Sequence, residues 1–178
     1  MKAVHRGDDT FTDIMCGRVP KDSLVIEMIG QIDELVAVLG VVRSVLSDDP
    51  RLESLEKKIR EHQRHLLRIA SYIASGGKSA AKPPISPEVL KSIEEEIREL
   101  WSKLPQPKGF IVPSGPLPAA VTNLARAICR RVERYASRLA REGYIEKLVY
   151  VYMNRLSDLL FVYLRYVVHV LGASEEYL

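Results

Sequence analysis

Apolar residues recur every three or four positions over five long stretches of the chain, which is the spacing of one face of an α-helix. Asp22 or Ser23 can cap the first stretch, and Ser86 followed by Pro87 opens the third. The pattern predicts helices over 24–47, 52–75, 86–104, 118–141 and 145–171. No alternation typical of a strand is found. We therefore expect an all-α fold, a five-helix bundle of the ferritin-like or four-helix-bundle type with one extra helix.

The segments between the helices differ in composition. Residues 1–20 are predicted to form a loop, and the run SGGKSAAKPP makes 75–86 the expected flexible loop. Five of the ten prolines lie between Pro105 and Pro118, so this segment is too proline-rich for a helix and, being apolar, must pack on something. A length of 178 residues suits one domain, and we expect a single domain over 1–178.

The last predicted helix is apolar nearly all round. Such a helix must be covered on several sides, by its own bundle alone or by other subunits as well, which favours a homo-oligomer. It does not read as a membrane span, because four polar residues interrupt the apolar run. These residues are Asn154, Arg155, Asp158 and Arg165.

Two features bear on the compartment. The first 13 residues carry acids where a secretion signal has an apolar core, so we expect a cytoplasmic protein. Cys16 and Cys129 are too few for a disulfide framework and match no paired metal-binding spacing. We expect two free thiols and no metal site built from side chains.

The net charge is only +3, but six arginines and one glutamate within 126–141 give this segment a net charge of +5. The residues are Arg126, Arg130, Arg131, Glu133, Arg134, Arg138 and Arg141. Planar guanidinium groups suit phosphate oxygens, so a polyphosphate is the expected ligand. A solvated basic face, or neutralisation by acids of the third helix, stays open as an alternative. A nucleic-acid-binding bundle is disfavoured, because the basic residues are confined to one helix.

Several polar residues fall on apolar helix faces. Asp33 lies among apolar residues of the first helix and needs an arginine or backbone donors within hydrogen-bond reach, unless it lies at an exposed edge. The last helix carries a polar stripe of Asn154, Asp158, Arg165 and His169. Buried polar groups of this kind are satisfied or functional, although His169 alone is typical of a helix C-terminus.

Two C-terminal stretches, LARAICRRVER at 124–134 and MNRLSDLLFVYLRY at 153–166, resemble signature sequences of the PduO-type cobalamin adenosyltransferases. Weaker matches in the same order are GDD with Thr12 and Asp13, RVPKDS with GQIDEL, and FIVPSG. Members of this family are trimeric helical bundles that transfer the 5′-deoxyadenosyl group of ATP to cob(I)alamin. The resemblance implies this activity, with ATP and cob(I)alamin as substrates and Mg²⁺ as cofactor. A non-catalytic carrier or sensor of nucleotide or corrinoid is the alternative.

The resemblance also implies residue roles. The nucleotide-binding residues would be Gly7, Asp8, Asp9, Thr12, Lys21, Arg130, Glu133, Arg134 and Asn154. The residues implied in catalysis are Arg126 and Arg130, with Asp33 paired to Arg126 and Phe110 beside the corrin. The nucleotide site would lie between subunits of a homotrimer. A cobalamin reductase and an adenosylcobalamin-dependent enzyme are the further partners that the reaction implies, with no nucleic acid and no membrane.

The chain departs from the family pattern at several positions, mostly near the N-terminus. His5, Arg6, Thr10 and Phe11 stand where Arg, Thr, Gly and Thr are common, and Ser114 replaces a glycine. Val36 and Leu67 replace the usual asparagine and phenylalanine. None of these changes removes a cation that would bind phosphate, so we expect activity to be retained.

Overall fold

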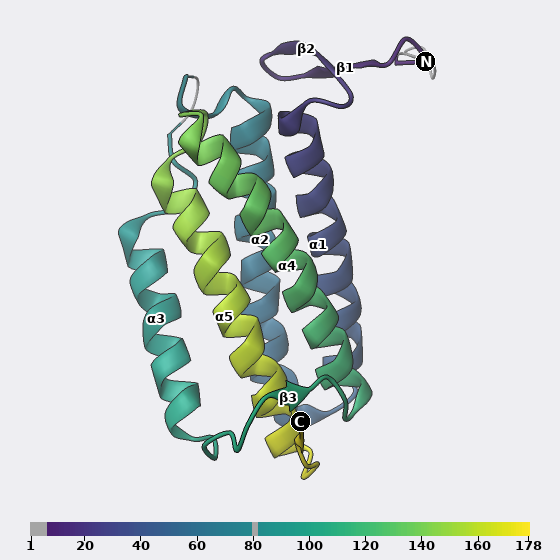
Figure 1. Ribbon diagram of the computed structural model, residues 1–178, viewed down its shortest axis with the longest axis vertical. Helices are drawn as coiled ribbons and strands as arrows, with labels where there is room; N and C mark the ends of the chain where they lie inside the picture. Colours follow the sequence, from purple (N-terminus) through teal and green to yellow (C-terminus); the bar gives the residue numbers. More distant parts are fainter. Residues whose placement is uncertain (1–6, 80–81) are drawn as a thin grey trace.

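The computed structural model describes residues 7–79 and 82–178 and contains five long helices, as the apolar spacing predicted (Figure 1). They are α1 (Leu24–Leu46), α2 (Glu53–Ala74), α3 (Pro87–Ser102), α4 (Leu117–Arg141) and α5 (Lys147–Val170). Helix α1 packs on α2 and α4, α4 packs on α5, and α3 lies against the side of α5. The departures at His5 and Arg6 lie outside the described residues.

The helix ends follow local signals. Ser23 is the N-cap of α1 and accepts a hydrogen bond from the Ile26 N–H at 3.5 Å. Short 3₁₀ turns, η1 (Pro50–Leu52) and η2 (Gly77–Ser79), precede α2 and follow it. Gly143 turns the chain between α4 and α5 with φ +76°, a conformation that glycine adopts without steric cost. Such short connections bring the helices they join side by side.

Helix α5 is buried on nearly every side within a single chain. Its apolar residues pack with those of the other helices in one core, and even Arg165 is only 1% exposed. The all-round apolar character of this helix is therefore explained by its own bundle, as one of the two expected covers, and the homo-oligomer stays a prediction. No helix among the described residues is long and apolar enough to cross a membrane.

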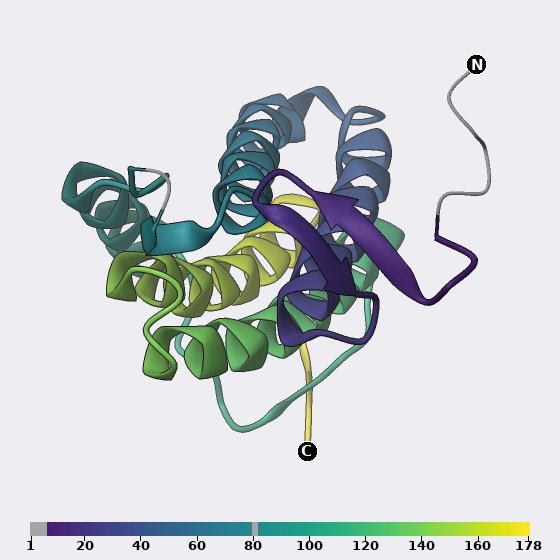
Figure 2. The same ribbon diagram turned by 90° about the horizontal axis from the view of Figure 1, so that it is seen from above.

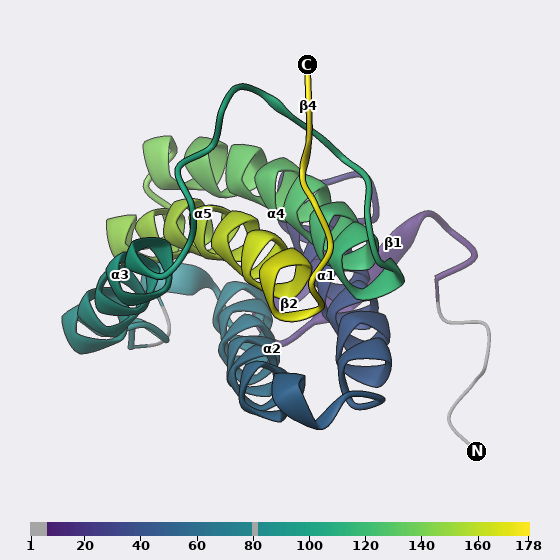
Figure 3. The same ribbon diagram turned by 90° about the horizontal axis from the view of Figure 1, so that it is seen from below.

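Two small antiparallel sheets were missed by the sequence pattern. The expected loop over 1–20 contains a hairpin of β1 (Phe11–Ile14) and β2 (Gly17–Pro20), which lies across the end of the bundle near α1 (Figure 2). The second sheet pairs β3 (Ile111–Val112) with β4 (Glu176–Tyr177). The proline-rich segment does pack, as expected, and its partner is the C-terminal segment (Figure 3).

The expected flexible loop is partly packed. The Lys78 N–H donates to the Tyr144 carbonyl at 3.0 Å, and Gly77 is buried against the same residue. A Cβ atom at Gly77 would lie 2.1 Å from the Tyr144 carbonyl oxygen. Because residues 80–81 lie outside the described part, the flexibility of 75–86 as a whole stays a prediction.

Candidate functional site

Three arginines, Arg126, Arg130 and Arg134, follow one another at intervals of four residues along α4 and so share one face. Arg134 Nη1 donates to the Arg130 carbonyl at 3.1 Å, and Arg126 Nε donates to Asn123 Oδ1 at 2.9 Å. Burial, together with the charge of Arg130, lowers the pKa of Arg126. Within the described part of the chain, none of the three forms an ion pair with a carboxylate. This row is therefore an uncompensated cationic surface.

Two further arginines of α4, Arg131 and Arg138, are neutralised. Arg131 reaches across to α1, where it donates to Gln31 and Glu34. Arg138 Nε donates to Glu142 at 3.1 Å on the same helix. Neutralisation, left open from the sequence, thus holds for these two arginines, by Glu34 of α1 and by Glu142, the C-cap residue of α4, rather than by acids of the third helix. It does not extend to the row of three.

A hydrogen-bonded chain of side chains lies beside the row. Asn154 Nδ2 donates to Glu133 Oε1 at 2.9 Å, and Asn154 Oδ1 accepts from Arg155 Nη1 at 2.7 Å. Arg155 Nε in turn donates to Glu94 Oε1 of α3 at 2.8 Å. The Asn154 amide is thereby fixed on both sides. Glu94 thus brings an acidic residue of α3 into this network.

Asp158 lies one helical turn beyond Asn154. Desolvation raises the pKa of its carboxyl, and Glu133 adds to this, against the charges of Arg155 and Arg130. The charges of Arg130 and Glu133 both act on Asp158, so Asp158 lies near these two residues. The Asn154–Asp158 part of the stripe on α5 therefore meets the arginine face of α4.

The N-terminal loop and Lys21 form a second cluster. Lys21 N–H donates to the Thr10 carbonyl at 2.9 Å, and a Cβ atom at Gly7 would lie 3.1 Å from Lys21 Nζ. Thr10, where the family commonly has glycine, adopts φ +68°, a left-handed conformation that favours glycine. Asp9 forms an ion pair with Arg18 at 2.5 Å, while Asp8 is exposed. Thr12 follows in β1.

No hydrogen bond or ion pair joins the two clusters among the described residues of one chain. Thr12 and Asp33 line a mainly apolar pocket between the hairpin, α1 and α2, whereas Arg126 faces α5, with its guanidinium 5.9 Å from the Phe161 ring centroid. Asp33 is exposed and forms no ion pair with Arg126. The expectation of a partner within hydrogen-bond reach was therefore wrong for a single chain. The exposed edge, weighed as the alternative, is what the structure shows.

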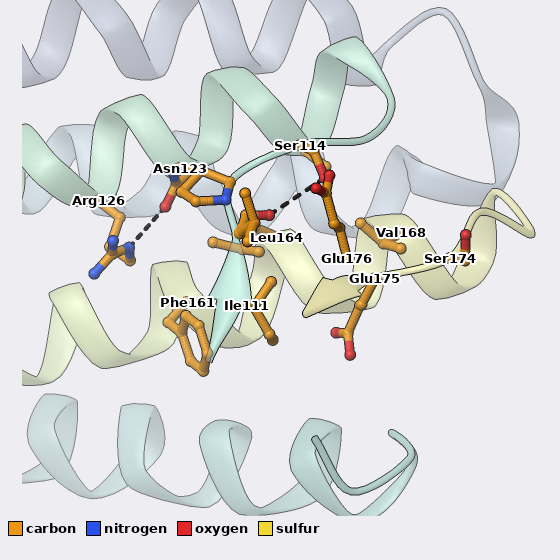
Figure 4. Close-up of a pocket in the computed structure, with 13 residues that line it drawn as sticks. Ile111, Ser114, Asn123, Arg126, Phe161, Leu164, Val168, Ser174, Glu175 and Glu176 are labelled. Carbon is orange, nitrogen blue, oxygen red and sulfur yellow. Dashed lines mark hydrogen bonds between the residues drawn. The ribbon is translucent and has the colours of Figure 1, made fainter. Parts of the chain in front are cut away.

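A pocket next to Arg126 contains residues that the sequence did not single out (Figure 4). Asn123, Phe161, Glu175 and Glu176 line it together with Arg126. Phe110 lies just before β3, with 83% of its surface exposed. No sequence signal pointed to the C-terminal carboxylates, because they reach this pocket only through the β3–β4 pairing.

The model of the family described as cobalamin adenosyltransferase matches residues 3–167 of the chain. The chain belongs to the cobalamin adenosyltransferase family. It is 33% identical over 161 residues to a corrinoid adenosyltransferase of Bacillus subtilis, covering 90% of this chain and 83% of that one. It is 30% identical over 176 residues to the corrinoid adenosyltransferase MMAB of Homo sapiens, covering 96% and 70%.

Solved structures agree with this membership. A phenylalanine-to-alanine variant of a PduO-type ATP:corrinoid adenosyltransferase from Lactobacillus reuteri, complexed with cobalamin and ATP, matches with a TM-score of 0.92. The match has 25% identity and covers 100% of this chain and 99% of the other. An arginine-to-lysine variant complexed with ATP has a TM-score of 0.91 at 26% identity, covering 99% of each. The family resemblance seen in the sequence and the helical-bundle fold expected from it are confirmed.

Proposed function

We propose that this protein transfers the 5′-deoxyadenosyl group of ATP to cob(I)alamin, giving adenosylcobalamin and triphosphate. The observation that carries the proposal is the uncompensated row of Arg126, Arg130 and Arg134 beside the fixed Glu133–Asn154 pair. A row of guanidiniums without carboxylate partners suits a polyphosphate. The chain has the whole fold of a family whose solved relatives are complexed with cobalamin and ATP.

The reaction needs no nucleophile from the protein. Cob(I)alamin attacks the ribose C5′ with its cobalt electron pair, a Co–C bond forms, and the C5′–O bond breaks with its electrons leaving on triphosphate. The protein aligns cobalt and C5′ and stabilises the charge on the leaving group. Arg130 and Arg134, with Lys21 of the N-terminal cluster, are suited to the phosphates. Phe110 would keep water and an axial ligand away from cobalt.

Among the described residues, no group of three His, Cys, Asp or Glu side chains could hold a metal ion by itself. Mg²⁺ is commonly held by substrate phosphates with one or two carboxylates, so a site with few protein ligands fits Mg²⁺ that enters with ATP. Asp8 of the N-terminal loop is the carboxylate that we assign to it. When bound there, Mg²⁺ would neutralise part of the triphosphate charge.

The active assembly that we propose is a homotrimer with each site shared by two subunits. Among the described residues of one chain, no hydrogen bond or ion pair joins the N-terminal cluster to the arginine row, and neither Asp33 nor Arg126 forms an ion pair. A neighbouring copy whose Arg126 faces Asp33 would join both halves and both charges. We also place the reaction in a reducing compartment, the cytoplasm, because cob(I)alamin is readily oxidised. A cobalamin reductase would supply it, and an adenosylcobalamin-dependent enzyme would take the product.

Charge reversal tests the shared site. Asp33→Arg and Arg126→Asp should each reduce the trimer measured by sedimentation velocity, and the double variant should restore it. Equal amounts of trimer in all four proteins would contradict the proposed pairing. A wild-type monomer would contradict the shared site altogether.

The reaction itself is tested anaerobically with reduced cobalamin, ATP and Mg²⁺. The expected result is loss of the cob(I)alamin spectrum, a light-sensitive alkylcobalamin product and release of triphosphate. Arg130→Ala should lose at least about tenfold in turnover, or about 1.4 kcal/mol of transition-state stabilisation, with the fold intact. Arg138→Ala, which removes an arginine of the same helix already paired with Glu142, is the matched control. Binding of ATP without turnover in the wild type would instead support the carrier.

A further inference from the structure

The segment that carries Phe110 is held by the C-terminal end of the chain. We call residues 103–116 the strap and residues 171–178 the tail (Figure 3). In the β3–β4 pairing, Ile111 lies opposite Tyr177, and the Leu178 N–H donates to the Phe110 carbonyl at 2.9 Å. The main chain at Phe110 is thus fixed by the main chain of the tail.

A buried arginine of α5 connects the tail to the bundle. Arg165 of α5 donates to both carboxylate oxygens of Glu175, from Nε at 2.5 Å and from Nη2 at 3.1 Å. The same Nη2 donates to the Pro105 carbonyl of the strap at 2.7 Å. The guanidinium lies 4.8 Å from the ring centroid of Trp101 at the end of α3. Arg165 therefore contacts the tail, the beginning of the strap and α3 at once.

The carboxylate in this network is held in its charged form. Burial would raise the pKa of Glu175, but the hydrogen bonds from Arg165 and from the Tyr177 hydroxyl lower it overall. Among the described residues, Glu175 is the only carboxylate that forms an ion pair with Arg165. The third guanidinium nitrogen, Nη1, is buried without a hydrogen-bond partner. Loss of Glu175 would leave an unpaired charge inside the protein, which the tail could relieve only by moving.

The same tail forms a wall of the pocket beside Arg126. Glu175 and Glu176 line one side of that pocket, and Phe161 and Arg126 line another (Figure 4). A displacement of the tail would therefore alter both the backbone at Phe110 and the shape of this pocket. It would leave untouched the Glu133–Asn154 pair and the loop around Lys21, to which neither the strap nor the tail contributes a contact named above.

We infer that Arg165 is a positioning residue for the corrinoid: through Glu175 and the tail it holds the strap so that Phe110 and the pocket beside Arg126 meet the corrin. This inference rests on the proposed function. Arg165 does not touch the reacting atoms. It affects the binding of the corrinoid and has no direct effect on the binding of ATP.

The test compares two buried carboxylates of similar environment. Glu175→Gln breaks the anchor, and Glu56→Gln removes a carboxylate that is about equally buried and is paired with Arg43 and Arg60 in the α1–α2 part of the bundle. The side-chain exposures are 10% for Glu175 and 11% for Glu56. Tyr177→Phe, which removes only one hydroxyl from the network, is a milder variant that keeps the test usable if Glu175→Gln does not fold.

The expected result is selective. Glu175→Gln should raise the KM for the corrinoid at least fivefold, as estimated from the loss of one charge-assisted hydrogen-bonded pair at about 1 kcal/mol or more. The KM for ATP should stay within about twofold, and Glu56→Gln should change neither. Hydrogen exchange of the strap amides around Phe110 should become faster in Glu175→Gln and in Tyr177→Phe only.

The outcomes separate this inference from the proposed function. An unchanged corrinoid KM in Glu175→Gln, or an equal change for both substrates, overturns the positioning role while leaving the reaction in place. A wild-type protein that makes no adenosylcobalamin overturns the proposed function. In that case, retention of cob(II)alamin in ultrafiltration decides the inference, since equal retention by wild type and Glu175→Gln contradicts it.

Discussion

Acidification should destabilise the protein through one buried histidine, His62. Its side chain lies between α2, α3 and α5, is 6% exposed, and has Nδ1 3.1 Å from the Tyr152 hydroxyl. Burial, and to a lesser degree the charges of His65 and Lys58, lower the pKa of His62 to about 3. In the folded protein His62 is therefore neutral over the whole range in which a free histidine takes up a proton.

The sign and size of the effect follow from this difference. The unfolded chain binds a proton at His62 below about pH 6.5, and the folded chain does so only near pH 3, so acid favours the unfolded state between these values. Each pH unit in this window costs up to about 1.4 kcal/mol. Between pH 7.5 and pH 5.0 the loss from His62 is about 2 kcal/mol. Well above pH 6.5, where His62 is neutral in both states, the free energy of unfolding is not reduced by this histidine.

The assay is urea unfolding followed by circular dichroism at pH 7.5 and pH 5.0, at one fixed protein concentration. His62→Gln keeps an amide that can bond to Tyr152 but cannot titrate. The loss of unfolding free energy between the two pH values should be about 2 kcal/mol smaller in this variant than in the wild type. The other ionisable groups that line the same pocket are identical in both proteins, so the comparison isolates the contribution of position 62. Equal losses in the two proteins would refute the reasoning.

Three further predictions concern the site and the packing. Asn154→Ala should lower kcat/KM for ATP by about tenfold, because it frees Glu133 from a 2.9 Å hydrogen bond, and steady-state kinetics at saturating corrinoid measure this. Gly77→Ala should lower the melting temperature, because its Cβ would lie 2.1 Å from the Tyr144 carbonyl oxygen; an unchanged melting curve would contradict this packing. Arg131→Ala should leave the KM for ATP unchanged while reducing stability by less than about 1 kcal/mol, because it pairs with Glu34 at the surface.

The helices could be predicted closely because their signals are local. Ser23 as N-cap and the turn at Gly143 are both visible in a few consecutive residues. The small sheets could not be predicted in this way. Strands β1 and β2 have four residues each, too short for a clear alternation, and β3 pairs with a segment more than sixty residues further along the chain. Pairing over such a distance leaves no local trace.

In the candidate site, too, features within one helix could be predicted from the sequence, and contacts between distant segments could not. The four-residue spacing of Arg126, Arg130 and Arg134 is enough to place them on one helix face. That Arg131 is neutralised depends on the packing of α1 against α4, which brings Glu34 opposite it. The sequence marked Arg165 as a polar residue that needs a reason but could not name Glu175, because that contact exists only once the tail folds back.

The position of Asp33 shows what a family resemblance adds and what it leaves to experiment. Its place among apolar residues demanded a charged partner, and the resemblance named Arg126. Within one chain the Asp33 side chain is exposed and is solvated by water, so no charged partner is required there. A second subunit that packed on this apolar face would bury the carboxylate, and burial would then require a cation. Asp33 is thus the residue at which charge reversal tests the shared site most directly, and this argument is independent of the apolar character of α5 that first suggested a homo-oligomer.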